Sequence, residues 1–402
     1  MPSTSSYNNP DRSASAWSSS TLQVAHWSAV TSLALGVFGL VMAEFLPASI
    51  LTAMATDLQI SDGAAGQAVT TTALVGALAA PSMPLLTRRF DRKTVMLTLT
   101  LLLVFSNALA ATAQSFSQLL ASRVMLGVAL GGFWSMSAAL AMRLVPESLV
   151  ARAMSLILTG VSVATVGAAP LGAWMSDVWG WRSAFIAAAA ASVLALVAQW
   201  ITLPSLPARD NPNLRVLSEL LRRPSVRVAL LSVLLLISGH FAGFTYIRPL
   251  MEQIANMSVS AISGVLLGYG IAGFFGNLVG GWLTARSERI AVVFGGATIA
   301  MLTGTLLLAG SSSVVMTIAV TMWGFAFGTF PVAFQTWIVR AAPDQPEGAG
   351  GLLVAGFQVA IAIGAVGGGV LVDLFGAYGG PAFALVVITL GTLLTLRHGP
   401  RI

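Results

Sequence analysis

Long apolar stretches alternate with short polar segments along almost the whole chain. A helix of about 20 apolar residues crosses a hydrocarbon core of ~30 Å, because each residue advances the helix by about 1.5 Å. The pattern therefore predicts an all-α membrane protein with twelve transmembrane helices. They are expected near residues 28–54, 65–87, 94–113, 117–142, 150–175, 182–203, 227–248, 258–284, 290–309, 312–339, 348–373 and 378–396.

The polar segments divide the chain into bundles, a linker and a tail. The longest polar interruption, at 205–226, predicts a cytoplasmic linker between an N-terminal six-helix bundle at 27–204 and a C-terminal six-helix bundle at 227–402. Within the linker, residues 216–223 could form an amphipathic helix on the membrane surface or a solvated loop. The Ser-rich residues 1–26 lack the short apolar core of a signal peptide and predict a disordered cytoplasmic tail.

The second half of the chain repeats the first. The segment LTRRFDR at 86–92 returns as LTARSER at 283–289, and Asp177 returns as Asp373. An apolar chain with two similar halves is typical of a secondary transporter whose binding site lies where the halves meet. The repeat predicts two bundles related by a pseudo-twofold axis along the membrane normal.

Composition and charge exclude a soluble domain. Hydrophobic residues make up 56% of the chain and charged residues 8%, against about 25% charged residues in soluble domains. With a cytoplasmic N-terminus, the 20 Arg and Lys residues fall in the tails or the even-numbered connections, except Arg123, Arg182 and Arg248. This positive-inside pattern predicts a multi-pass inner-membrane protein with both termini in the cytoplasm. It also explains the high isoelectric point without a nucleic-acid partner.

Several kinds of chemistry lack their residues. The chain has no cysteine and only 3 histidines, so no metal-ligand cluster or thiol nucleophile is expected. Its one lysine, Lys93, follows Arg92, so there is no ATP-binding P-loop. No cofactor and no enzyme activity are expected. A membrane protein that senses a ligand without moving it stays open as an alternative, although duplicated halves favour transport.

Three ionisable residues are candidates for proton coupling. Glu44 is the acidic residue that lies well inside an apolar helix, where burial favours the protonated carboxyl. Arg123, in the fourth predicted helix, lies at a compatible depth for a direct or water-bridged ion pair that a proton on Glu44 would weaken. His240 is the histidine inside a predicted helix and could titrate near neutral pH or simply pack. Arg248 is interpreted as an anchor at the membrane interface.

Aromatic, hydroxyl and amide residues expected to face the centre are candidate substrate contacts. For each of them, a hydrogen bond between helices is the alternative role. As a set they suit a small neutral ligand with a flat face and several hydroxyls or ring nitrogens. The expected contacts are Phe133, Trp134, Ser137, Tyr246, Asn277, Gln335, Trp337 and Gln358.

Four motifs resemble those of the major facilitator superfamily. Residues 86–97 are similar to its loop motif, 120–131 to its Arg-bearing fourth-helix motif, and 160–172 to the fifth-helix motif of antiporters. The sequence GWRSAF at 180–185 is similar to the drug:proton antiporter branch. The resemblance covers about residues 27–396. It agrees with alternating access in the two-bundle fold that the repeat predicts, and the protein is expected to function as a monomer.

The loop motif departs from the family pattern, since Arg88 stands at the usual acidic position and Asp91 at the usual glycine. The resemblance nevertheless implies a gating role for this loop and its repeat, with Asp91 as the substitute acid. The residues concerned are Arg89, Asp91, Arg92, Arg286, Glu288 and Arg289.

Within that branch, residues 44–47, 131–146 and 244–249 look most like bacterial purine ribonucleoside efflux transporters. This resemblance implies proton-coupled efflux, by antiport, of purine ribonucleosides and their analogues. A sugar or multidrug exporter of the same superfamily remains the alternative, as does a facilitator without coupling.

Overall fold

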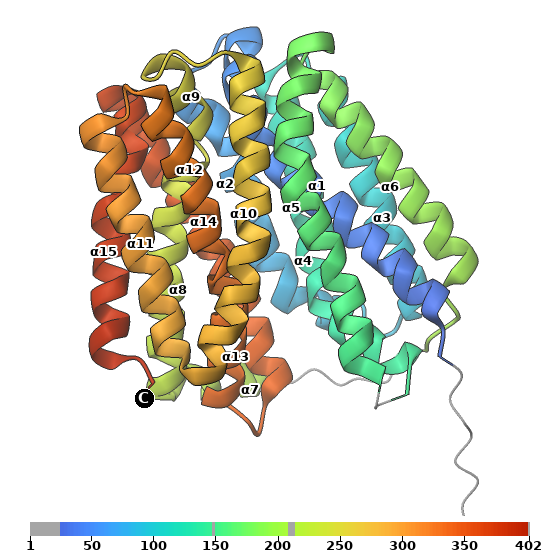
Figure 1. The fold of residues 1–402 in the computed structure, drawn as a ribbon. Helices are drawn as coiled ribbons and strands as arrows, with labels where there is room; N and C mark the ends of the chain where they lie inside the picture. Colours follow the sequence, from blue (N-terminus) through green and yellow to red (C-terminus); the bar gives the residue numbers. More distant parts are fainter. Residues whose placement is uncertain (1–24, 147–148, 208–213, 401–402) are drawn as a thin grey trace, which may run out of the picture.

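The computed structural model describes residues 25–146, 149–207 and 214–400, and its secondary structure over these ranges is helical (Figure 1). The expected tail lies outside the described residues except for its last two, as do residues 208–213 of the expected linker. The helices are α1 (Trp27–Leu58), α2 (Asp62–Leu86), α3 (Arg92–Ala111), α4 (Phe116–Leu144), α5 (Val150–Trp179), α6 (Arg182–Thr202), α7 (Leu214–Arg222), α8 (Pro224–Phe244), α9 (Ile247–Gln253), α10 (Val259–Arg286), α11 (Glu288–Ala309), α12 (Ser313–Gly328), α13 (Phe330–Ala341), α14 (Pro346–Phe375), the 3-10 helix η3 (Gly376–Tyr378) and α15 (Gly379–His398).

Short polar residues begin several of these helices. Ser61, Ser115 and Ser258 each accept a hydrogen bond from the backbone N–H three residues later, at the start of α2, α4 and α10. Asp91 does the same for the backbone N–H of Lys93 at the start of α3. Such caps satisfy N–H groups that have no partner inside the helix.

Helices α1–α6 pack mainly on one another, and so do α8–α15. One apolar cluster contains residues between Ala29 and Leu203, and a second lies mostly between Leu220 and Ile388. The two sets of helices meet where α2 packs on α14, α5 on α10 and α1 on α9. Figure 1 shows α5 and α10 side by side along this contact. Groups carried by α1, α2, α8 and α14 can therefore reach across from one half to the other.

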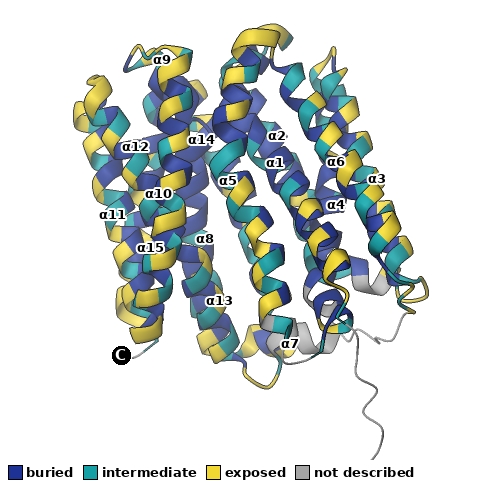
Figure 2. Ribbon diagram, turned by 45° about the vertical axis from the view of Figure 1, so that its right-hand side comes forward, coloured by how far each residue is buried: buried dark blue, intermediate teal, exposed yellow. Residues whose placement is uncertain are grey.

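Eleven stretches of the described residues are long and apolar enough to cross a membrane. The last, Gly348–His398, has 51 residues and contains both α14 and α15, so the predicted number of twelve stays a prediction. Large apolar side chains such as Leu194, Trp200 and Leu308 are exposed on the outside, and Figure 2 shows exposed residues along the outer faces of the helices. Such faces suit contact with lipid rather than with water.

Two predicted helices are interrupted. The helix expected at 227–248 ends at Phe244, and α9 follows from Ile247; the helix expected at 312–339 is divided between Gly328 and Phe330. Pro249 and Pro331 lie just beyond these breaks. Because proline has no N–H and its ring clashes with the carbonyl four residues earlier, it cannot continue the preceding helix. The hydropathy of both stretches is continuous and gave no sign of the breaks.

The linker contains the short helix α7, so the helical alternative for this segment is confirmed. Leu220 is buried, and α7 packs on α8 and α14. Directly after it, the guanidinium of Arg223 donates two hydrogen bonds, of 2.6 and 2.7 Å, to the carboxylate of Asp344. These bonds lower the pKa of Asp344 to about 2 and raise the pKa of Arg223. The linker is thereby tied to the connection between α13 and α14.

Candidate functional site

A carboxyl group from α1 meets an amide from α14 where the two halves touch. The Nε2 of Gln358 donates to the Oε1 of Glu44 over 3.4 Å. Gln358 is 5% exposed, and its Oε1 is buried without a hydrogen-bond partner. Phe45 extends the contact to α8, with its ring 6.2 Å from Phe241 and 6.0 Å from Phe244. Two polar side chains from different halves thus lie in apolar surroundings and depend on each other.

Arg123 is fully buried in α4 beside α1. Its guanidinium donates to the carbonyl of Ala43 at 3.2 Å and to Ser122, and lies 4.8 Å from the centre of the Phe185 ring. A second guanidinium nitrogen has no partner. Of the two alternatives expected for Arg123 and Glu44, the direct ion pair is not formed in this conformation, and the water-bridged pair stays a prediction. The cation instead acts on α1 through the backbone of the residue before Glu44.

His240 lies inside a stack of aromatic rings. Its ring is parallel to Phe327 at 3.7 Å and to Phe244 at 5.5 Å, and Tyr269 stacks on Phe244 at 4.7 Å. The indole N–H of Trp323 donates to His240 Nδ1 at 2.9 Å. Because Nδ1 is an acceptor, the neutral ring carries its hydrogen on Nε2, which faces the Tyr269 hydroxyl at 3.5 Å. This arrangement favours the packing role of His240, since a second proton would have to displace Trp323.

Further contacts between the halves gather at the end of the molecule that carries α9, called here the α9 end. Asp373 of α14 accepts hydrogen bonds from Ser61 Oγ at 2.9 Å and from the backbone N–H of Gly63 at 3.0 Å. It therefore sits at the N-terminus of α2, where backbone N–H groups attract a negative charge. A Cβ on Gly66 would overlap the Tyr246 hydroxyl, so glycine allows α2 to approach the connection between α8 and α9.

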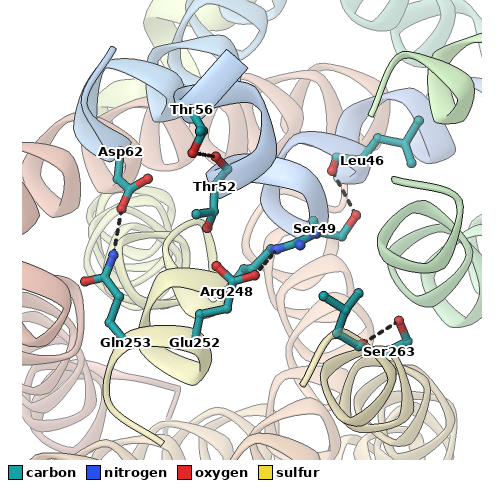
Figure 3. A network of polar contacts seen from close by, with 10 residues as sticks. Leu46, Ser49, Thr52, Thr56, Asp62, Arg248, Glu252, Gln253 and Ser263 are labelled. Carbon is teal, nitrogen blue, oxygen red and sulfur yellow. Dashed lines mark hydrogen bonds and ion pairs between the residues drawn. The ribbon is translucent and has the colours of Figure 1, made fainter. Parts of the chain in front are cut away.

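Two residues at this end differ from their prediction. Arg248 is 5% exposed, donates to the Ser49 carbonyl at 2.6 Å and pairs with Glu252 at 2.7 Å (Figure 3). The membrane-interface anchor expected here is wrong, because the guanidinium replaces water with partners from α1 and α9. Tyr246, expected among the substrate contacts, is buried and donates to the Ala365 carbonyl at 2.7 Å. Both side chains join helices at the α9 end.

A shallow cavity of about 430 Å³, open to the outside, lies beside these contacts. Its lining residues come from α1, α5 and α9 and from the α5–α6 connection, and include Thr52, Ser176, Trp181, Arg248 and Glu252. The ion pair between Asp57 and Arg182, at 2.8 Å, lies at the same end of α1. The cavity is bounded by residues of both halves.

The remaining predicted substrate contacts are scattered. Phe133 is buried in the N-terminal core against Gly36 of α1, so the expectation that it faces the centre is wrong. The direction of the Phe133 side chain is set by how α4 packs on its neighbours, because α4 is apolar on more than one face and its sequence does not mark an inner one. The Ser137 hydroxyl donates to the Trp134 carbonyl within α4, and Trp337 stacks on Phe334. Gln335 is exposed on α13, while Asn277 of α10 has a buried Oδ1 without a partner.

The predicted gating residues form contacts inside each half. Asp91 accepts from Ser205 at 2.7 Å, and Arg92 donates to the Thr87 hydroxyl at 3.1 Å. In the repeat, Glu288 pairs with Arg340 at 2.5 Å. Their relation to a gate stays a prediction. The others are Arg89, which is exposed, Arg286, which lies 3.5 Å from the centre of the Trp282 ring, and Arg289, which is half-buried.

Asp373, Trp323, Tyr269 and Phe327 make contacts in this region, although none of them was expected as a site residue. Asp373 repeats Asp177, which could have drawn attention to it. The three aromatic residues carried no signal, since aromatic residues are common in apolar helices.

Residues 33–350 match the Major Facilitator Superfamily. The purine ribonucleoside efflux pump NepI of Shigella sonnei (strain Ss046) is 42% identical over 371 residues, which cover 92% of this chain and 93% of that protein. The pump of the same name from Escherichia coli (strain UTI89 / UPEC) is 42% identical over 353 residues, covering 87% and 89%.

Two solved structures have the same fold. The human organic anion transporter MFSD10 (TETRAN) has a TM-score of 0.68 at 20% identity and covers 93% of this chain and 100% of that one. A bacterial homologue of the human lysosomal transporter Spinster, in an inward-facing and unoccupied conformation, has a TM-score of 0.71 at 14% identity and covers 93% and 97%. The chain is thus a membrane transporter by relatives, fold and span pattern, and it belongs to the major facilitator superfamily.

Proposed function

We propose that this protein exports purine ribonucleosides and their analogues in exchange for protons, by alternating access. The proposed substrate is supported by one observation, the 42% identity to purine ribonucleoside efflux pumps over 92% of the chain. The coupling rests on Glu44, a carboxyl held between the halves where a proton decides its charge.

The proposed architecture has twelve crossings in two six-helix bundles. Helices α8 and α9 together form one crossing, as do α12 and α13, whereas α14 and α15 form two. The sequence repeat and the packing of α1–α6 and α8–α15 support this assignment. The distribution of Arg and Lys supports an inner membrane with both termini in the cytoplasm. In that orientation the α9 end faces the periplasm and is closed by its contacts.

The proposed roles follow from the contacts. Glu44 carries the proton, and Arg123 supplies positive charge through the Ala43 carbonyl, which holds α1 in place. His240 belongs to an aromatic wall and does not carry the proton. The proposed substrate contacts are Trp134, Ser137, Asn277, Gln335, Trp337 and Gln358. The transporter functions as a monomer with a small neutral solute and protons as its ligands.

Counterflow in proteoliposomes tests the substrate. Vesicles loaded with unlabelled inosine should accumulate radiolabelled inosine or guanosine, while a sugar and a panel of cationic drugs should compete poorly. Exchange of a sugar or drug without nucleoside exchange would reject the proposal in favour of the alternative exporter. Binding of nucleoside without any counterflow would favour a sensor.

Substituting Glu44 tests the coupling. In Glu44→Gln the group can no longer release a proton, so nucleoside counterflow should persist while uptake driven by a pH gradient in everted vesicles falls to background. Glu219→Gln, at an exposed position on α7, is the matched control and should behave like the wild type. Gradient-driven uptake that survives in Glu44→Gln would remove Glu44 from the mechanism.

A further inference from the structure

The contact between Glu44 and Gln358 consists of one hydrogen bond where two could form. The amide gives one hydrogen bond through Nε2, while its Oε1 is buried and accepts none. A buried acceptor without a donor is unfavourable. The neighbouring carboxyl can supply that donor, because a protonated carboxyl carries one O–H whereas an ionised one only accepts.

We propose that protonated Glu44 and Gln358 form an acid–amide pair with two hydrogen bonds, so that Gln358 converts protonation of Glu44 into a preference for the conformation closed at the α9 end. The proton is added to Oε2 of Glu44, which becomes neutral, and the new O–H donates to Oε1 of Gln358. The Nε2–H continues to donate to the other carboxyl oxygen. This inference rests on the proposed function, in which Glu44 carries the proton.

The position of Gln358 explains why the pair would affect the conformation. Glu44 lies in α1 and Gln358 in α14, so the pair links the two halves. The same helix α14 carries Asp373, which holds the N-terminus of α2 at the α9 end. The two residues are separated by about four helical turns. Movement of α14 away from α1 and α2 would therefore break both contacts together.

The direction agrees with antiport. With the α9 end facing the periplasm, a proton that enters from outside stabilises the closed outer end and returns the empty transporter to the inward-facing state. Loss of that proton to the cytoplasm removes one hydrogen bond and leaves a charged carboxylate. The transporter can then open outward with its substrate. Proton and substrate are thus carried in opposite directions.

Other charged groups on the helices packed around α1 have different partners. Arg123 of α4 reaches the Ala43 carbonyl, Arg248 and Glu252 of α9 meet at Ser49, and Arg182 pairs with Asp57. His240 of α8 faces aromatic rings. The remaining groups lie in the end turns of their helices; they are Asp62, Arg92, Lys93, Arg143, Arg152, Asp177, Arg227 and Asp373.

Cross-linking at the α9 end tests the pair without any nucleoside. The chain contains no cysteine, so Asp62→Cys with Gln253→Cys places a reporter where these side chains lie 3.2 Å apart. The two thiols are bridged by a short exposure to Hg²⁺, which displaces their two protons and needs no oxidant. From about pH 9 to about pH 5, the ratio of cross-linked to free protein should rise roughly twofold to tenfold, the range that one net hydrogen bond supplies. The same cysteine pair in the Gln358→Leu background reports any pH dependence of the thiol reaction itself and should lack this rise.

Two more variants sharpen the result. Glu44→Gln should cross-link strongly at every pH, because two amides also form two hydrogen bonds and neither titrates. Gln118→Leu, the same change at the start of α4, should retain the wild-type rise. Gln358→Asn keeps an amide one carbon shorter and should weaken the rise; it replaces Gln358→Leu if the leucine variant elutes as aggregate on size exclusion.

Two outcomes would contradict the proposed role of Gln358. A wild-type rise retained in Gln358→Leu or Gln358→Asn, or cross-linking independent of pH in the wild-type background, overturns the role of Gln358. Nucleoside counterflow is measured separately on the cysteine-free chain. Its absence, with the pH-dependent cross-linking intact, would reject the proposed substrate and leave the acid–amide pair standing.

Discussion

At the scale of single residues, the polar groups inside apolar helices are explained by partners rather than by type. Glu44, Arg123 and His240 are all ionisable and lie in apolar helices, yet they have an amide, a backbone carbonyl and an indole N–H as partners. Because an unpaired polar group in hydrocarbon is costly, each partner limits what its residue can do. Glu44 has the weakest partner and is the most free to change its protonation.

The His240–Trp323 hydrogen bond predicts a non-additive effect on stability. His240→Phe should lower stability by about 1–3 kcal/mol, because it leaves the Trp323 N–H buried without an acceptor. Adding Trp323→Phe removes that donor, so the double variant should lose less than the sum of the single losses. Thermal unfolding in detergent measures all three. Strictly additive losses would indicate that the hydrogen bond contributes nothing.

At the scale of the helices, proline and close contacts decide where segments end and how near they lie. Pro249 and Pro331 end α8 and α12 early, while Pro47 and Pro170 lie inside α1 and α5 without ending them. Proline is tolerated in membrane helices when neighbours satisfy the freed carbonyl. Proline in the sequence therefore could not by itself locate the breaks.

Gly66 predicts a selective effect at the contact between α2 and Tyr246 of the α8–α9 connection. In Gly66→Ala the new methyl group overlaps the Tyr246 hydroxyl, which should weaken the closed α9 end by about 1–3 kcal/mol, the usual penalty for overpacking. A cysteine introduced as Thr52→Cys, in the cavity at this end, should then react faster with a polar thiol reagent. Gly264→Ala is the control, since nothing lies within 4 Å of its added Cβ. Equal reaction rates for both variants would contradict the contact.

The Arg223–Asp344 ion pair predicts a small acid-sensitive contribution to stability. Since the pKa of Asp344 is lowered to about 2, the pair stabilises the fold above the ordinary carboxyl pKa of about 4, and this contribution is lost as the pH falls through about 2. Asp344→Asn should melt slightly lower than the wild type at neutral pH and match it in strong acid. A difference that persists in acid would point to another cause.

At the scale of the whole molecule, repeat-related residues of the two halves make different contacts. Asp373 caps α2 at the α9 end, whereas its repeat partner Asp177 is exposed. A symmetric sequence thus folds into a structure in which one carboxylate holds the halves together.

Neutralising Asp373 predicts opening of the α9 end. Asp373→Asn keeps the shape but exchanges charged hydrogen bonds for neutral ones, a loss of about 1 kcal/mol. Labelling of Thr52→Cys should accelerate about fivefold, as that energy implies. Asp177→Asn, the repeat-related control, should label at the wild-type rate. Faster labelling in both variants would mean that net charge, not the cap, controls this end.

Much of the fold and some of the candidate site could be predicted from sequence. The apolar stretches, the linker with its possible helix, the family and the single deep carboxyl are local properties of the chain, fixed by length, hydropathy and charge. Gln358 was expected near the centre and meets Glu44 there.

The directions of side chains could be decided only by the tertiary structure. Phe133 faces the N-terminal core, Arg123 binds a carbonyl instead of Glu44, and Arg248 is buried between α1 and α9. In water an amphipathic pattern marks the inner face of a helix. In lipid both faces are apolar, so the rotation of each helix is chosen by close packing and hydrogen bonds with its neighbours, which no local pattern in the sequence records.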